Sequence, residues 1–300
     1  MKWNIDDIPI FLAIIEHKGI TAAADRLNMP KSTVSRTLSR LEADMNIRLF
    51  ERTTRQLQLT PEGASFAPYA QAIMDQAAKA EQALSGKPIA PRGILKIALP
   101  VTFSREIIGS KWHDFTTAYP DITLQITLTS YDVNLRRDEF DIAVIEGPVT
   151  DHSLDVTELV STPLIWVSSP YYKRQFHFDD TASSLKSHIR YIEPQYCTSK
   201  LSFKTPSGRQ YIDTSKLMSI NDVSALRDLT LQGDGVALLP ELYCLPHLKR
   251  GDLVELCPEV IAEAQLDVRA ITPQKDRRST KAELCLQFIT DCLADYRDIR

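Results

Sequence analysis

The stretch Ile20–Thr60 constrains this chain more than any other part of its 300 residues. It opens with the alanine-rich segment Thr21–Leu27, which predicts a short helix whose small side chains allow close packing. After a tight turn, Val34, Leu38 and Leu41 recur at spacings of four and three, which is typical of the buried face of a helix. Two helices joined by a turn are therefore expected here.

The opposite face of the second helix, over residues 31–44, carries short hydroxyls and cations and no large apolar side chain. Hydroxyl and guanidinium groups are donors that fit against a phosphate backbone and against base edges. The residues of this face that we expect to contact double-stranded DNA are Lys31, Ser32, Thr33, Ser35, Arg36 and Arg40.

The residues that follow this helix predict a hairpin. Residues 49–52 and 56–59 are typical of two short strands, and the turn between them carries Arg52, Thr54 and Arg55. A hairpin of this kind beside a helix-turn-helix is a wing, which can reach the minor groove or the flanking phosphates. We expect these three residues to contact DNA as well.

The distribution of charge supports this interpretation. The whole chain has a formal net charge of −4, which taken alone is unusual for a DNA-binding protein. Residues 26–55 nevertheless hold seven Lys and Arg against three Asp and Glu, whereas residues 61–300 hold 26 against 32. The positive charge is concentrated in the segment that we expect to bind DNA.

This segment resembles the winged helix-turn-helix of LysR-type transcriptional regulators. The resemblance rests on the alanine-rich helix with Leu27 and on the runs Val34-Ser35-Arg36, Leu41-Glu42, Leu49-Phe50-Glu51-Arg52 and Leu59-Thr60-Pro61-Glu62-Gly63. The sequence departs from the family pattern at Pro30, where a Ser is usual, and at Asn46, where a Gly is common. An ordinary polar surface helix in another kind of domain is the alternative, and the wing argues against it.

A long helix is expected over residues 61–85, because Thr60-Pro61 is a typical cap and first helical residue. Its small and apolar residues follow a heptad pattern at Phe66, Ala70, Ile73, Ala77, Ala80 and Leu84. The simplest partner of this seam is the same helix of a second subunit, although it could also pack on its own chain. The resemblance implies a dimer through this linker helix and a tetramer through further contacts.

Residues 86–93 are rich in Gly and Pro and predict a hinge. Beyond it, strand and helix patterns alternate, beginning with a strand over 94–100 and a helix over 104–118, so this part is α/β. It resembles the LysR-type effector domain, similar in fold to periplasmic solute-binding proteins, on the residues Tyr119-Pro120-Asp121, Phe140-Asp141-Ile142-Ala143, Asn221-Asp222 and Gly233–Pro240. The resemblance implies two lobes, one of residues 94–161 with 267–300 and the other of residues 162–266. The expected fold is therefore α/β overall, with a winged helix-turn-helix over residues 1–60.

In the resembled fold a small-molecule effector lies in the cleft between the lobes, near strand ends. Thr102, Phe103 and Ser104 follow the first strand and Thr129 ends another, at positions that match those facing the effector in the family. A helix cap or a strand-end hydroxyl is an equally simple role for them. Many relatives carry an Arg in the strand before Gly147-Pro148, but this chain has Glu146 there, which favours a neutral or cationic effector over an anion.

No pattern in the sequence indicates an enzyme, a cofactor or a metal site. The six histidines lack metal-binding spacings, and no nucleophile elbow or phosphate-binding loop occurs. A soluble binding protein with an unrelated helical domain is the second hypothesis. The five scattered cysteines, of which Cys197 is the best candidate for a redox sensor, and the lack of a signal peptide or membrane span predict a cytoplasmic protein.

The function expected from these observations is sequence-specific binding to a partly palindromic operator, modulated by the effector. We expect the effector to shift a population of conformations, which the linker helices carry to the DNA-binding domain. The coupling free energy that this requires is only about 1–3 kcal/mol.

Overall fold

The computed structural model describes residues 3–52, 57–85, 91–129, 133, 135, 138, 140–196, 200–274 and 278–296. The chain forms two compact units. The first contains Met1–Leu95, Thr116–Gln125 and Lys275–Leu284, and the second contains Lys96–Phe115, Ile126–Gln274 and Cys285–Arg300. The predicted wing residues Thr54 and Arg55, the side chain of Arg52, and Cys197 lie outside the described residues.

The N-terminal part is a helix-turn-helix preceded by one further helix. After a short 3-10 turn, η1 (Ile5–Asp7), come α1 (Ile8–Glu16), α2 (Ile20–Leu27) and α3 (Lys31–Met45). Asn28 ends α2 and Asn46 ends α3 in the left-handed conformation, with φ of 52° and 55°. Asn tolerates this conformation better than most residues, so the two ends are encoded locally.

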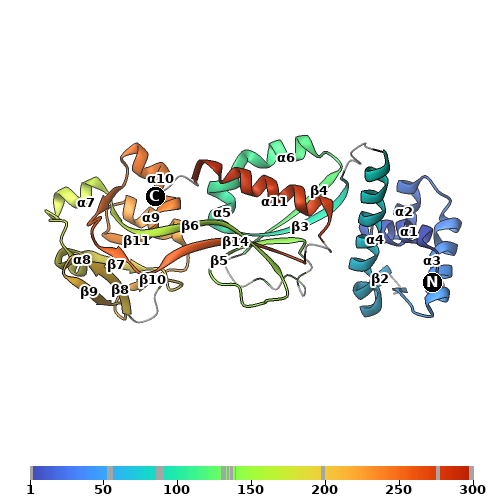
Figure 1. Cartoon of the computed structure of the whole chain (residues 1–300), viewed down its shortest axis with the longest axis horizontal. Helices are drawn as coiled ribbons and strands as arrows, with labels where there is room; N and C mark the ends of the chain where they lie inside the picture. The colour runs from blue at the N-terminus through green and yellow to red at the C-terminus, as the bar shows by residue number, and fades with distance from the viewer. Residues whose placement is uncertain are drawn as a thin grey trace. The chain divides into compact units, whose positions relative to one another are not determined.

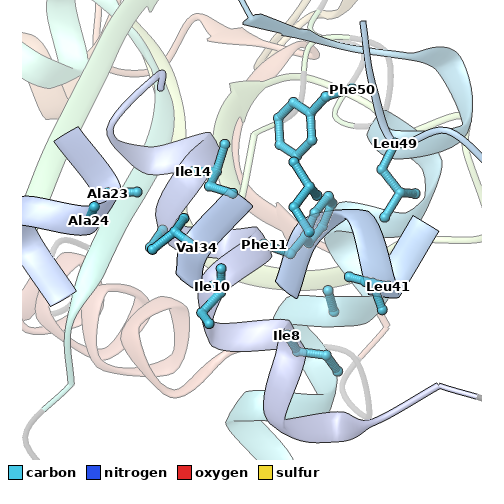
Figure 2. Packing of buried hydrophobic residues seen from close by; sticks show 13 residues of the cluster. Ile8, Ile10, Phe11, Ile14, Ala23, Ala24, Val34, Leu41, Leu49 and Phe50 are labelled. Atoms are coloured by element: carbon cyan, nitrogen blue, oxygen red, sulfur yellow. The ribbon is translucent and has the colours of Figure 1, made fainter. Parts of the chain in front are cut away.

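The three helices enclose one apolar core (Figure 2). Ala23 and Ala24 of α2 are buried, and their small size lets α2 approach α1 and α3 closely. The ring of Phe11 lies edge-on to that of Phe50, with centroids 5.6 Å apart. The predicted apolar stripe of α3 is confirmed, because Val34 and Leu41 are fully buried and Leu38 nearly so.

The hairpin and the start of the long helix that follows it are packed closely against each other. β1 (Phe50–Arg52) pairs antiparallel with β2 (Leu57–Leu59). The Thr60 hydroxyl donates to the carbonyl of Arg48 at 2.7 Å and accepts from the N–H of Gly63 at 2.9 Å, so it caps the next helix. A Cβ on Gly63 would lie 2.1 Å from the carbonyl oxygen of Leu49, so only glycine fits there.

The long helix α4 (Pro61–Ser85) uses part of its heptad seam within its own chain. Ala70 is fully buried, and Phe66 and Ile73 pack against the core of the three N-terminal helices. The sequence favours a second subunit as the partner of this seam and leaves packing on its own chain as the alternative, and the first half of the seam packs on its own domain core. The reason is that α1 and α3 leave an apolar side that α4 covers.

The second part of the chain is built on one sheet. Its nine strands in the described residues are β3 (Gly93–Pro100), β4 (Ile122–Thr129), β5 (Ile142–Glu146), β6 (Asp155–Ser168), β7 (Ile189–Ile192), β10 (Met218–Ser219), β11 (Val236–Pro240), β12 (Val254–Leu256) and β14 (Gln265–Thr272). They follow the order β10-β7-β11-β6-β14-β5-β3-β4, and β12 also pairs with β6. The strand β6 is long enough to pair with β14 along its first part and with β11 and β12 at its end, so the two halves of the sheet are continuous.

The remaining elements are a small second sheet and the helices. β8 (Lys200–Thr205) and β9 (Gly208–Asp213) form a hairpin that β13 (Ile261–Ala262) extends. The further helices are α7 (Pro170–Gln175), α8 (Ala182–His188), α9 (Val223–Leu231), α10 (Glu241–Arg250) and α11 (Thr280–Cys292), with 3-10 turn η5 (Ala294–Tyr296). α9 and α10 pack against β11 and β6 (Figure 1).

The helix predicted over residues 104–118 is broken, and this prediction was wrong in its continuity. α5 (Val101–Phe103) starts three residues early and runs into a π-helical turn at Ser104–Ile108. Gly109, with φ of 45°, ends that turn before a 3-10 turn and α6 (Trp112–Ala118). A positive φ at a glycine interrupts helical hydrogen bonding. The pattern of apolar residues did not indicate this break at Gly109.

Candidate functional sites

The first candidate site is the outer face of α3. Lys31, Ser32 and Arg36 are exposed, whereas Thr33 and Ser35 are half-buried beside the stripe that packs on the core. Lys31 is also the first residue of the helix, where the backbone N–H groups and the helix dipole favour an anion. This face can therefore approach a phosphate backbone with donors of several kinds.

Arg40, the sixth residue predicted on this face, already has a partner within the domain. Its Nε donates to Oδ2 of Asp7 at 3.0 Å, and a second guanidinium nitrogen bonds the other carboxylate oxygen. Asp7 is 1% exposed, and this carboxylate raises the pKa of Arg40. The ion pair ties α3 to the start of α1, a role that the sequence did not indicate.

The base of the wing is held by a carboxylate of α3. Oε1 of Glu42 accepts hydrogen bonds from the backbone N–H groups of Leu49 (2.8 Å) and Phe50 (3.0 Å). These two donors lie at the start of the hairpin, where Phe50 is the first residue of β1, so Glu42 satisfies backbone N–H groups at the base of the wing. The Glu42 side chain thus ties the first strand of the hairpin to α3.

The second candidate site lies at strand ends in the other part of the chain. β3 runs parallel to β5, so α5 after β3 and Glu146 at the end of β5 lie at the same edge of the sheet. Thr102 is buried, and its hydroxyl lies 3.0 Å from that of Ser224 on α9. Phe103 is fully buried and Ser104 is half-buried.

Thr129 is less central than the other predicted effector residues. It is half-buried at the end of β4, and β3 separates β4 from β5 in the sheet. The structure therefore brings Thr102 and Glu146 to one edge, leaves Phe103 in the core, and holds Thr129 two strands away from Glu146.

Glu146 is the centre of a group of polar side chains. The hydroxyl of Tyr243, a buried residue of α10, donates to its Oε1. Burial raises the pKa of Glu146, the hydrogen bond from Tyr243 opposes that rise, and the nearby Asp222 adds to it. Asp222 caps α9 by accepting from the N–H of Ala225 at 2.9 Å.

A second carboxyl reaches this group from β7, and sequence reasoning missed it. Glu193 is 4% exposed, and its Oε1 accepts from the N–H of Gln195 at 3.4 Å. The side chain of Gln195 donates to the carbonyl of Glu146 at 2.7 Å, which links the two segments. Burial raises the pKa of Glu193 to about 7, and the charges of Glu146 and Asp222 add to the rise.

Two polar atoms of this group have no hydrogen-bond partner among the described residues. They are Oε2 of Glu193 and the hydroxyl of Tyr196, and both are buried. Burial also raises the pKa of Tyr196 far above its ordinary value, with Glu146 and Glu193 contributing. We call Glu146, Glu193, Asp222 and Tyr196 the acidic cluster.

The buried cation near this group is already neutralised. Nη1 of Arg227 on α9 lies 2.6 Å from Oε2 of Glu106 and 3.1 Å from the carbonyl of Tyr243. Arg227 is 7% exposed, and the pair with Glu106 raises its pKa against the effect of burial. This ion pair connects α9 with the π-helical turn after α5.

The cysteines of the described chain are free thiols. Cys244, Cys257, Cys285 and Cys292 are buried. Burial raises the pKa of Cys244 and of Cys257 to about 12, so these thiols stay protonated at neutral pH. Within the described residues no group of His, Cys, Asp and Glu is arranged to hold a metal ion, and no helix there could span a membrane.

Comparison with known proteins adds a family to this geometry. Residues 5–64 match the family described as bacterial regulatory helix-turn-helix protein, lysR family, and residues 89–294 match the LysR substrate binding domain. The HTH-type transcriptional repressor PA14_22550 of Pseudomonas aeruginosa is 31% identical over 293 residues, covering 97% of this chain and 92% of the repressor.

Solved structures agree with the fold. The LysR-type transcriptional regulator CrgA from Neisseria meningitidis is similar with a TM-score of 0.62 at 24% identity, covering 98% of this chain and 100% of CrgA. Full-length LysG from Corynebacterium glutamicum, described with bound effector Arg, is similar with a TM-score of 0.53 at 17% identity, covering 97% and 98% of the two chains. At these identities the likeness establishes the architecture.

Proposed function

Because this chain belongs to the LysR family of DNA-binding transcriptional regulators, which are not enzymes, we propose which of its residues contact the operator and which contact the effector. The proposed division is a winged helix-turn-helix over residues 1–60, a linker helix over 61–85, a hinge over 86–93 and an effector domain over 94–300. The effector domain has lobes of residues 94–161 with 267–300 and of residues 162–266. Such a regulator works in the cytoplasm.

The observation that carries the DNA contacts is the two-sided character of α3. Its apolar residues are buried while Lys31, Ser32 and Arg36 are exposed on the other side. Arg36 and Ser35 contact base edges, and the first turn of α3 binds phosphate. The wing residues Arg52, Thr54 and Arg55 add contacts to the flanking backbone. Arg40 acts mainly through Asp7 and supports this surface from behind.

A second subunit is proposed to cover the side of α4 that does not face its own core. Tyr69 is 58% exposed there, and Ile47 is 43% exposed beside it. Together with Met45, Pro61 and Phe66 they line a groove of about 420 Å³ within this domain. A paired linker helix that buries this groove would hold two DNA-binding domains at a fixed separation, as a partly palindromic operator requires.

The effector is proposed to bind where Thr102, Ser104 and Glu146 meet the segments of the second lobe. Its binding shifts the population of lobe conformations, and the linker helices transmit this to the DNA-binding domains. A differential affinity of the effector for the two conformations supplies the coupling, about 1–3 kcal/mol.

Titration of labelled DNA from upstream of the gene for this protein and its neighbours tests the DNA contacts. Wild-type protein binds one such fragment tightly, with an affinity that falls steeply as salt rises because counterions are released. Ser35→Ala and Arg36→Ala each weaken binding about 10- to 100-fold. Lys186→Ala, which removes an exposed cation of α8, is the control and binds like wild type.

Two results would refute the proposal. One is a protein that binds none of these fragments at low ionic strength. The other is an Arg36→Ala variant whose operator affinity equals that of the Lys186→Ala control.

A further inference from the structure

We propose that the acidic cluster binds the cationic end of the effector, an ammonium or guanidinium group. This inference rests on the proposed function, because it takes the edge of the sheet at Glu146 as the effector site. It goes further by assigning the ligand contacts to Glu193 and Tyr196 together with Glu146, and by fixing the charge of the ligand.

The first support is the state of the Glu193 side chain. It is 4% exposed, and one of its carboxylate oxygens, Oε2, has no partner among the described residues. A buried carboxylate oxygen without a donor is unfavourable, and buried polar groups are nearly always hydrogen-bonded. An N–H of a bound cation supplies the missing donor and at the same time offsets the negative charge.

The second support is the hydroxyl of Tyr196, which is buried beside the same carboxyls and has no hydrogen-bond partner in the part of the chain that the structure describes. This hydroxyl is uncharged at neutral pH, because burial and the charges of Glu146 and Glu193 raise its pKa. Its lone pairs can accept a hydrogen bond from an ammonium or guanidinium group that also contacts Glu193. A ligand with two or more N–H donors on one cationic centre satisfies both atoms.

The charges around the cluster also select for a cation. Glu146 and Asp222 each shift the titration of Glu193, so three carboxyls lie within electrostatic range of one another. Arg227, the buried guanidinium in this part of the described chain, is held by Glu106 and is not available to a ligand anion. An anionic ligand group would add a further negative charge at low dielectric, which is strongly unfavourable.

The cluster is also placed to sense the ligand. Glu146 ends β5, whereas Glu193 follows β7, and the strands β14, β6 and β11 separate these two in the sheet. Contact between their segments runs through Gln195, which bonds to both. A cation between the two carboxyls therefore favours the conformations in which the two halves of the sheet bring them together.

Thermal unfolding and calorimetric titration of the full-length protein test this inference. The probes are agmatine, putrescine and L-arginine at millimolar concentration, with L-citrulline as the neutral analogue of arginine and glutarate as an anion. At least one of the three cationic probes raises the melting temperature of the wild-type protein, and citrulline and glutarate do not. The pH is kept above the pKa of Glu193.

Three variants assign the effect to the cluster. Glu193→Gln keeps the shape and removes the charge, and it weakens binding of the cation at least about tenfold. Tyr196→Phe weakens it less, because only one hydrogen bond is removed. Glu259→Gln removes an exposed carboxyl elsewhere and leaves binding unchanged.

The inference is overturned if no cationic probe raises the melting temperature, if glutarate does so instead, or if Glu193→Gln binds the cation as tightly as wild type. Operator binding measured on the same preparation separates this failure from that of the proposed function. A protein that binds operator DNA but ignores the cations refutes only the ligand class, whereas one that binds no DNA refutes the regulator assignment.

Discussion

The outer face of α3 and the acidic cluster are both charged, but they differ in where their charges lie. The cations of α3 belong to one helix of 15 residues and reach into solvent. The carboxyls of the cluster come from separate segments: Glu146 and Glu193 are 47 residues apart, and Glu193 and Asp222 are 29 residues apart. Glu193 is almost fully buried. Salt screens exposed charges, so the effect of the α3 face depends on how many cations it carries. A buried charge is screened much less, so a single carboxyl of the cluster can have a large effect on its own.

The two regions also depend on different supports. The α3 surface is held by contacts within a single domain, namely the close backbone approach at Gly63, the bonds from the Glu42 carboxylate to the wing and the Arg40–Asp7 ion pair. The cluster is held by side chains that connect distant segments, such as Gln195 and the Arg227–Glu106 pair. A substitution in one support should therefore leave the other region working.

Gly63→Ala should disrupt the DNA-binding domain more severely than the other substitutions. The added Cβ would lie 2.1 Å from a backbone oxygen of Leu49, so α4 and the wing have to separate. We expect a loss of about 3 kcal/mol in the stability of the N-terminal domain and no detectable operator binding. Circular dichroism melting and DNA titration measure the two effects.

Gly19→Ala is the matched control for this change. Nothing lies within 4 Å of a Cβ at Gly19, and its φ of 171° is extended backbone that any residue adopts. If Gly63→Ala melted at the wild-type temperature, the close contact at Leu49 would not matter for stability. The same would follow if Gly19→Ala lowered the melting temperature as much as Gly63→Ala does.

Arg227→Met should disrupt the effector domain. It leaves Glu106 and the carbonyl of Tyr243 without their buried donor, and a broken ion pair of this kind costs about 3 kcal/mol. We expect the effector domain to melt earlier while operator binding below that temperature is retained. The double variant Arg227→Met/Glu106→Gln should recover part of the loss, because no unpaired charge remains. Equal melting of the single and double variants would contradict this explanation.

Glu193→Gln should change how the stability of the protein depends on pH. The pKa of Glu193 rises from an ordinary 4.5 to about 7 in the folded protein, so the folded chain keeps a proton that the unfolded chain releases. Stability from this group is complete below 4.5 and is lost as the pH rises through 7. Relative to Glu193→Gln, wild type should lose about 2 kcal/mol between about pH 5.5 and about pH 8. Parallel stability curves for the two proteins would refute the raised pKa.

The α3 face depends on a local sequence pattern, whereas the acidic cluster depends on contacts between distant segments, and this decides how much of each could be predicted. The buried stripe of α3 is a local repeat, so Val34, Leu38 and Leu41 were assigned correctly from spacing alone. The ion pair of Arg40 with Asp7 joins residues 33 positions apart, and neither residue carries a local signal for the other. For the same reason the sequence placed Arg40 on the DNA-facing side without its partner.

The acidic cluster shows this limit more clearly. Glu146 was found because it follows a recognisable strand and departs from a family pattern. Glu193 directly follows a short strand, β7, but only the parallel pairing of β7 with β11 brings it towards Glu146. The sequence offers one indication of this site, an acidic residue directly after Ile189–Ile192. That residue can be assigned to the site of Glu146 only when the order of the strands in the sheet is known.

The smallest expected effect on folding separates two arginines of α3. Arg40→Ala leaves the carboxyl of Asp7, 1% exposed, without its cation, so we expect the melting temperature to fall by a few degrees. Arg36→Ala removes an exposed side chain and should change operator affinity without changing melting. The double variant Arg40→Ala/Asp7→Asn should regain stability, because the amide carries no charge. If Arg40→Ala melts like Arg36→Ala while losing as much DNA affinity, Arg40 belongs to the DNA-contacting surface and not to its support.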